Sequence, residues 1–225
     1  MNNRLDFDFA IDGAQVFSGA LMTCMAELEA ALAGLPTDEV GTRIHDIEAL
    51  KPLLANDGCI GAVAASILGT QSKPVRAILF NKSAETNWSL AWHQDRTICV
   101  KEKRKVPGFG PWTVKRGMHH VAPPFELLER MVTLRAHLDD VPASNAPLLI
   151  ASGSHTRGRI PVREVEAIVR ACATRTCLAE AGDIWLYSTP ILHASGAAKE
   201  PSSRRVLQVD FAAEWLPDGL EWLGV

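Results

Sequence analysis

Apolar positions in the first third of the chain follow the spacing of helices. Steps of three or four residues predict a helix over residues 14–33, in which the apolar positions are Phe17, Leu21, Met25, Leu28 and Leu32. Similar patterns predict helices over 47–54 and 60–68, and Asp57 is the candidate cap between them. We expect this helical part, residues 1–70, to pack on the outside of a sheet.

From residue 75 onward the pattern changes to short apolar runs typical of strands. An amphipathic stretch over 161–172 interrupts them and predicts a surface helix. Several short strands after N-terminal helices are typical of a β-sandwich or barrel, so we predict a mainly β fold with flanking helices. The predicted strands lie at residues 75–80, 88–92, 97–101, 132–138, 147–151, 183–187, 192–193 and 204–212.

Composition narrows the class of protein. A chain of 225 residues with 47% hydrophobic residues suits one domain, residues 1–225, with its β core over 75–215. The net charge of −3 gives no electrostatic footprint for nucleic acid. No apolar run reaches the length of about 18 residues that a membrane span needs. We therefore expect a soluble protein, monomer or homodimer, that binds neither nucleic acid nor a membrane.

Cysteine usage and the first residues bear on the compartment. The five cysteines are scattered and odd in number, which argues against a disulfide framework and for a reducing environment. Residues 1–6 do not resemble the start of a secretory signal. These features predict a cytoplasmic protein.

The candidate chemistry lies at the end of the run Trp92-His93-Gln94-Asp95. Side chains at i and i+2 of an extended strand point the same way, so His93 and Asp95 can reach one metal ion. A distant histidine, His193, is the candidate third ligand, although a lone histidine is more often a hydrogen-bonded core residue. Two histidines and one carboxylate with open positions are typical of non-haem Fe(II) oxygenases. A structural zinc site would favour four ligands with cysteines, and the sequence has no Cys-x-x-Cys pair.

Residues 103–124 follow this motif and are rich in glycine and proline. Long irregular connections in compact domains are often functional. We therefore expect residues 103–122 to form a lid over the site, and we expect Trp112 within them and Asn87 before the motif to be pocket residues. His119 and His120 are interpreted as an exposed pair in this lid.

Several short motifs occur in an order that resembles the phytanoyl-CoA dioxygenase family of Fe(II)/2-oxoglutarate oxygenases. The resemblance extends from Arg76 to Trp222 and implies a double-stranded β-helix, or jelly roll, in which His93, Asp95 and His193 bind iron. The motifs are Asn87-Trp88, Trp92-His93-Gln94-Asp95, Gly153-Ser154-His155, His193-Ala194-Ser195-Gly196 and Arg204-Arg205.

The resemblance also implies a site for the co-substrate. Arg204 matches the arginine that binds the distal carboxylate of 2-oxoglutarate, and Ser195 matches a residue that hydrogen-bonds the same group. A guanidinium offers a planar two-pronged donor for a carboxylate. Arg205 is the rival, but neighbouring residues on a strand face opposite sides, so only one of the two can enter the barrel. Gln94 should likewise point away from the metal.

The implied activity is hydroxylation of a small molecule that uses Fe(II), 2-oxoglutarate and O2 and yields succinate and carbon dioxide as co-products. Two alternatives remain. A catalytically silent jelly-roll protein could bind a metal or ligand on the same scaffold. A hydrolase is less favoured, because no Gly-x-Ser-x-Gly motif accompanies Ser154 and His155.

Overall fold

The structure, a computed structural model, describes residues 7–36, 38–83, 85, 87–200 and 202–225. Its helical segments are α1 (Phe9–Asp12), α2 (Met25–Leu32), η1 (Glu48–Leu50), α3 (Lys51–Leu54), α4 (Gly61–Leu68), α5 (Phe125–Glu129), η2 (Ser154–Arg157), η3 (Val162–Glu164) and α6 (Val165–Ala171). Residues 1–6, on which the expectation about a signal sequence rests, lie outside the described part.

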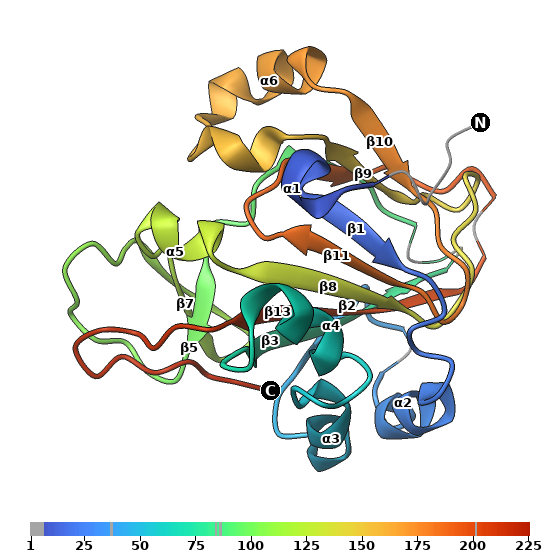
Figure 1. The fold of residues 1–225 in the computed structure, drawn as a ribbon, viewed down its shortest axis with the longest axis horizontal. Helices are drawn as coiled ribbons and strands as arrows, with labels where there is room; N and C mark the ends of the chain where they lie inside the picture. Colours follow the sequence, from blue (N-terminus) through green and yellow to red (C-terminus); the bar gives the residue numbers. More distant parts are fainter. Residues whose placement is uncertain (1–6, 37, 84, 86, 201) are drawn as a thin grey trace.

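Antiparallel strands form three sheets. The strands are β1 (Ala14–Phe17), β2 (Gly41–Ile44), β3 (Lys73–Lys82), β4 (Leu90–His93), β5 (Ile98–Val100), β6 (Trp112–Lys115), β7 (Met118–Val121), β8 (Val132–His137), β9 (Leu148–Ala151), β10 (Thr174–Cys177), β11 (Ile184–Ser188), β12 (His193–Ser195) and β13 (Arg204–Ala212). The largest sheet has the order β1-β11-β8-β13-β3-β2, the second β10-β9-β12-β4 and the third β5-β7-β6. The first two sheets form the jelly roll (Figure 1).

The large sheet packs against helices on one face and against the second sheet on the other, and side chains that alternate along its strands fill both interfaces. Leu134 of β8 and Leu207 and Phe211 of β13 are fully buried against helices α2, α3 and α4, which cover the outer face. Trp185 and Tyr187 of β11 point the other way and pack against residues of the second sheet such as Ile150. The helices therefore lie outside the sheet, as predicted, and the mainly β jelly roll is confirmed.

The prediction of a helix over 14–33 is wrong in its first part. Residues 14–17 form the edge strand β1, which pairs with β11, and the helix begins only at Met25. The strands β2 and β10 were also not predicted. Asp57 does not cap α4, because the N-cap position is Ile60. The N-terminal 70 residues thus contribute two strands to the sheet as well as helices.

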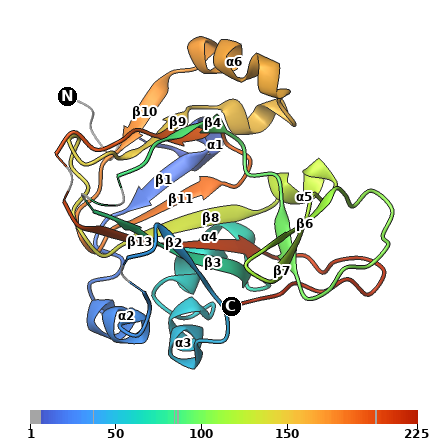
Figure 2. The ribbon, with the colours of Figure 1, turned by 180° about the vertical axis from the view of Figure 1, so that it is seen from behind.

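Residues 103–124 were expected to be irregular, and their second half contains a hairpin, whereas residues 103–111 form neither helix nor strand. Strands β6 and β7 pair with each other, and β7 also pairs with β5, which follows the His93–Asp95 motif. Figure 2 shows this third sheet beside the end of the jelly roll. His120 is buried within it, so the interpretation of His119 and His120 as an exposed pair is wrong for His120.

The cysteine argument also needs correction. Cys24 and Cys59 form a disulfide with their Cα atoms 6.6 Å apart, and it joins the start of α2 to the segment before α4. Cys99, Cys172 and Cys177 are free. Among the described residues, every helix is too short or too polar to cross a membrane.

Candidate metal centre

The two histidines of the site are direct partners across neighbouring strands. In the pairing of β4 with β12, His93 lies opposite His193, and their ring centroids are 4.2 Å apart. Facing residues of an antiparallel pair place their side chains on the same side of the sheet. The sheet register therefore brings together two residues that are 100 positions apart in the sequence.

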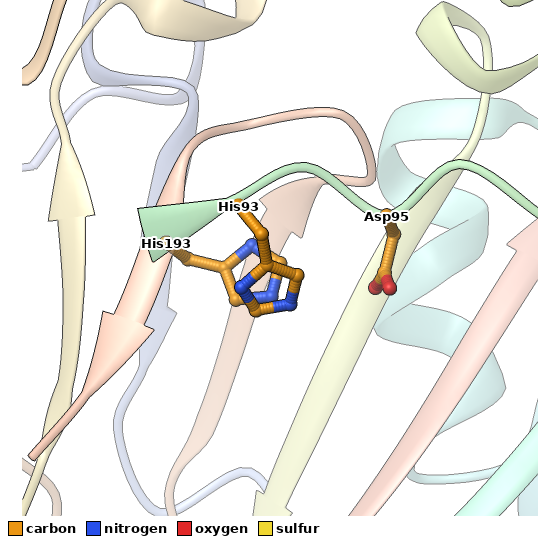
Figure 3. A group of neighbouring side chains, drawn as sticks. All are labelled: His93, Asp95 and His193. Atoms are coloured by element: carbon orange, nitrogen blue, oxygen red, sulfur yellow. The ribbon is translucent and has the colours of Figure 1, made fainter. Parts of the chain in front are cut away.

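Asp95 follows β4 and points to the same side as the rings (Figure 3). Candidate ligand atoms of His93, Asp95 and His193 all lie within 4.8 Å of one another. Gln94, between the ligands, is buried and points away. Its side-chain amide donates to the carbonyls of Gly158 (3.0 Å) and Pro190 (2.8 Å). This anchor holds the chain in the conformation that presents Asp95, and it confirms the predicted orientation of Gln94.

Each histidine is oriented by the carbonyl two residues before it in the sequence. The Nδ1 atom of His93 lies 2.8 Å from the carbonyl oxygen of Ala91, and that of His193 lies 3.0 Å from the carbonyl oxygen of Ile191. A carbonyl only accepts, so the contact requires a proton on Nδ1 of each ring and leaves Nε2 outside this hydrogen bond. Burial lowers the pKa of His193 to about 4, against the opposing effect of Asp95, so this ring is neutral near pH 7.

A buried network supports the carboxylate. Arg76 of β3 lies 3.6 Å from Asp95 and 2.6 Å from Asp210 of β13, its partner across the sheet. Asp210 also accepts a hydrogen bond from Thr133 (3.0 Å). Burial raises the pKa of Asp95, but the positive charge of Arg76 and the two neighbouring histidines bring it below its ordinary value. Asp95 is therefore held as a carboxylate.

The two candidate arginines face opposite sides of β13. Arg204 is buried on the inner side, where its guanidinium donates to the carbonyls of Asn145 (3.1 Å) and Ala146. Arg205 points outward and forms ion pairs with Asp139 (2.8 Å) and Glu29 (3.0 Å). The structure thus places Arg204, and not Arg205, on the side of the metal centre.

Ser195 lies close to Arg204 and shares a partner with it. Its hydroxyl donates to the carbonyl of Ala146 (3.1 Å), the residue that Arg204 also contacts. Ala146 has a positive φ of 50°, and its carbonyl oxygen accepts hydrogen bonds from both side chains. One guanidinium nitrogen, Nε of Arg204, is buried without a hydrogen-bond partner, so this corner has donor capacity for an anion.

These groups line a cavity of about 160 Å³. His93, Asp95 and His193 lie on its wall together with Ser195 and Arg204. The remaining lining is partly apolar and partly cationic. The apolar members include Ile78, Phe80, Trp88, Leu90 and Leu148, and the further cationic members are Arg43, Arg76, Lys115 and Arg135.

Other expected site residues lie elsewhere. Asn87 is engaged with the backbone of Ala198, donating to its carbonyl (3.0 Å) and accepting from its N–H (2.7 Å). Trp112 packs against the apolar cluster of the third sheet. Neither lines the cavity, so the structure gives both a structural place. Trp88, the neighbour of Asn87, does line the cavity.

Four cationic lining residues were not found from the sequence. Arg76 stands within an otherwise apolar predicted strand, and its charge at that position was the signal that could have found it. Arg135 alternates with Leu134 and Ala136 on a strand that also contains Thr133 and His137, so its charge was a weaker signal. Arg43 and Lys115 lie on strands that were not predicted. In the Gly153-Ser154-His155 motif the hydroxyl of Ser154 accepts the N–H of Leu192 (2.9 Å), so it is Ser154 that ties this turn to the strand of His193.

The donor set fits a divalent first-row metal. Two imidazole nitrogens and a carboxylate oxygen suit such an ion, and three protein ligands would leave positions free for other molecules. Both Nε2 atoms are available because the Nδ1 atoms are engaged with carbonyls. The arrangement can therefore hold a metal beside a cavity that ends at a buried guanidinium.

Comparison with solved structures gives the same overall fold. The structure of AviO1 from Streptomyces viridochromogenes Tue57 matches with a TM-score of 0.62 at 20% identity, over 93% of this chain and 92% of that one. The non-heme alpha ketoglutarate dependent epimerase SnoN from nogalamycin biosynthesis matches with a TM-score of 0.63 at 18% identity, over 96% and 89% of the two chains.

A third similar structure is HygX from Streptomyces hygroscopicus, with a TM-score of 0.61 at 16% identity over 92% of this chain and 87% of that one. No curated protein matches the sequence. The family model for phytanoyl-CoA dioxygenase matches residues 38–206, which include all three metal-site residues and Arg204. The chain therefore belongs to the phytanoyl-CoA dioxygenase family.

Proposed function

We propose that this protein is an Fe(II)- and 2-oxoglutarate-dependent dioxygenase that hydroxylates a small molecule. The observation that carries the proposal is the convergence of His93, Asp95 and His193 on the wall of a cavity that also contains Arg204. The proteins of similar fold support it. HygX binds nickel and 2-oxoglutarate, and SnoN binds Fe3+ and alpha ketoglutarate.

Each residue has a defined part in this proposal. His93 and His193 would each offer a ring nitrogen and Asp95 a carboxylate oxygen to the iron, and three protein ligands would leave positions for other molecules. Bound iron, with 2-oxoglutarate and O2, supplies the oxidising power for attack on a C–H bond, with succinate and carbon dioxide as co-products. The protein itself contributes binding, orientation and exclusion of water.

Arg204 and Ser195 are assigned to the far carboxylate of the co-substrate. The guanidinium gives a charge-assisted, two-pronged contact, and the hydroxyl of Ser195 turns from the Ala146 carbonyl to the carboxylate. The apolar lining residues Phe80, Leu90 and Leu148 exclude water along the way. The side chain of Arg204 is already held by backbone carbonyls, so little freedom is lost on binding.

Two measurements test the proposal. Fe(II) affinity is measured without oxygen for the wild type and for His93→Ala, Asp95→Ala and His193→Ala, with His45→Ala as the control outside the site. Each variant of the three should lose at least about tenfold in affinity, since each removes one of three ligands. Equal affinity in all five proteins would overturn the assignment.

A metabolite screen with succinate as the readout then tests the reaction. Succinate that forms only with Fe(II) and 2-oxoglutarate supports the dioxygenase class, and a product heavier by one oxygen supports hydroxylation. A product of unchanged mass would replace hydroxylation by an epimerase-type outcome. Iron binding with no succinate from any metabolite would favour the silent metal-binding protein.

A further inference from the structure

The cavity beside the metal centre contains more positive charge than the proposed co-substrate requires. Its lining includes Arg43, Arg76, Lys115, Arg135 and Arg204, whereas Asp95 is the single acidic residue of that lining. Arg76 is paired with Asp95 and Asp210, and Arg204 is assigned to 2-oxoglutarate. In the described part of the chain, no carboxylate pairs with the remaining three, Arg43, Lys115 and Arg135.

Arg43 is the clearest case. It lies on the edge strand β2 opposite Ile78, and both residues line the cavity. Its Nε atom is buried without a hydrogen-bond partner. Burial, followed by the nearby charges of Arg76 and Arg116, lowers its pKa. A half-buried guanidinium with an unused donor, surrounded by other cations, is unfavourable unless an anion joins it.

Lys115 approaches the same region from the other side. It ends β6 in the hairpin, and Lys115, Arg76 and Arg43 all act on His120, lowering its pKa after the larger effect of burial. The next residue, Arg116, donates to both carboxylate oxygens of Glu39 at 2.9 Å, which ties the hairpin to the segment just before β2. This bridge holds Lys115 and Arg43 on the two elements that flank the cavity.

Arg135 lies deeper, on β8. It donates to Gln208 (3.2 Å) and its guanidinium lies 5.5 Å from the ring of Phe80, while its Nε atom is buried and unpaired. Arg135 also acts near Arg204, the residue assigned to the co-substrate. Burial, followed by the positive charges of Arg204 and Arg135, lowers the pKa of Lys82 to about 8. The positive field thus extends from Arg204 to the hairpin.

We propose that the substrate is an anion, and that its carboxylate or phosphate group binds between Arg43 and Lys115 with Arg135 beneath. This inference rests on the proposed function, in that Arg204 and the metal are taken to hold 2-oxoglutarate. Two cations from separate elements can grip one anionic group, and removal of either leaves the other without its partner. Carboxylate and phosphate share this chemistry, and the experiment separates them.

The experiment uses the full chain loaded with Zn(II), a diamagnetic replacement for iron, and saturating 2-oxoglutarate. Methyl phosphate, acetate and the neutral control acetamide are titrated, and binding is followed by 1H–15N NMR. The anions should bind and acetamide should not. Arg43→Gln and Lys115→Gln should each weaken anion binding about tenfold or more, as expected for loss of a charge-assisted contact.

Two further variants separate a local contact from a general charge effect. Arg163→Gln removes the same charge at an exposed position and should leave anion affinity unchanged. Arg43→Lys keeps the charge and should retain part of the affinity, which also guards against a loss caused by misfolding. Tighter binding of methyl phosphate than of acetate indicates a phosphate-bearing substrate, and the reverse order indicates a carboxylate.

Three outcomes would overturn the inference. The anions could bind no better than acetamide, Arg163→Gln could weaken them as much as Arg43→Gln, or Arg43→Gln could weaken 2-oxoglutarate in place of the probes, which would assign Arg43 to the co-substrate. Failure of the proposed function looks different. In that case the wild-type protein fails to bind 2-oxoglutarate at all, whatever the probes do.

Discussion

Leu207, Val209 and Phe211 face the N-terminal helices from the outer side of β13, whereas Arg204, Gln208 and Asp210 face the inner side of the same strand. The outer residues are fully buried among apolar neighbours. The inner residues are held by hydrogen bonds and charges around a cavity. Because side chains alternate along a strand, one face of β13 contributes to folding stability and the other to the metal centre and its cavity. Substitutions on the two faces should therefore have different effects.

The largest expected effect is on the outer face. Phe211→Ala removes a fully buried ring from the cluster under the helices and should lower the free energy of unfolding by about 3–5 kcal/mol. Chemical denaturation measures this change. Fe(II) affinity of the protein that remains folded should stay within about twofold of the wild type. A large loss of metal affinity would show that the two faces are coupled.

On the inner face, Arg204→Ala should weaken 2-oxoglutarate binding about 10- to 100-fold, the range for loss of a contact to a charged group. Arg205→Ala is the matched control, because its guanidinium pairs outward with Asp139 and Glu29. Calorimetric titration of the metal-loaded protein gives both affinities. Equal losses in the two variants would contradict the division of β13 into two functional faces.

Arg76 should affect metal binding indirectly, because it pairs with the candidate metal ligand Asp95. Arg76→Gln removes the partner of Asp95 and Asp210 and should weaken Fe(II) binding about 10- to 100-fold, as for other residues that orient metal ligands. Arg96→Gln changes the residue next to Asp95, whose guanidinium contacts the Ile160 carbonyl, and should have little effect. Anaerobic titration with Fe(II) compares them, and an equal effect of Arg96→Gln would rule out a specific role for Arg76.

The smallest expected effect is a pH dependence of the free energy of unfolding that comes from His137 on β8. Burial lowers the pKa of His137 well below its ordinary value, and both ring nitrogens lack partners. Below a pH of about 6.5 the unfolded state binds a proton that the folded state refuses, so stability falls with pH by about 1.4 kcal/mol per unit from this group. His137→Leu should make the decline between pH 6.5 and 5 of the metal-free protein less steep by this amount. An unchanged slope would mean that His137 is protonated in the folded protein.

The residues of the metal site could be predicted because they stand close together in the sequence or belong to short motifs of the family. His93 and Asp95 stand two residues apart, and the distance from His193 to Arg204 suited one further strand. Alternation indicated that only one of Arg204 and Arg205 can enter the barrel, and the family resemblance favoured Arg204. The structure brings these residues together on one cavity wall, and the ligation itself stays a prediction until iron binding is measured.

Errors arose where a distant partner decides the local conformation. Residues 14–17 continue a helical spacing of apolar residues, yet they form β1 because β11 offers an edge 170 residues away in the sequence. The glycines and prolines that flank β6 and β7 led to the prediction of an irregular segment, whereas the two strands pair with each other and β7 also pairs with β5. The Cys24–Cys59 pair depends on how α2 meets the segment before α4, which spacing along the chain does not reveal.

The opposed pair of His93 and His193 has a consequence for how such a centre can be built. Each ring is oriented by the carbonyl two residues earlier in the sequence, so a three-residue segment contains both the histidine and the carbonyl that orients it. Only the strand register and one carboxylate must then come from elsewhere. This makes the two-histidine unit a transplantable module. Placed at facing positions of another antiparallel pair, it would present two aligned nitrogens without any redesigned outer layer.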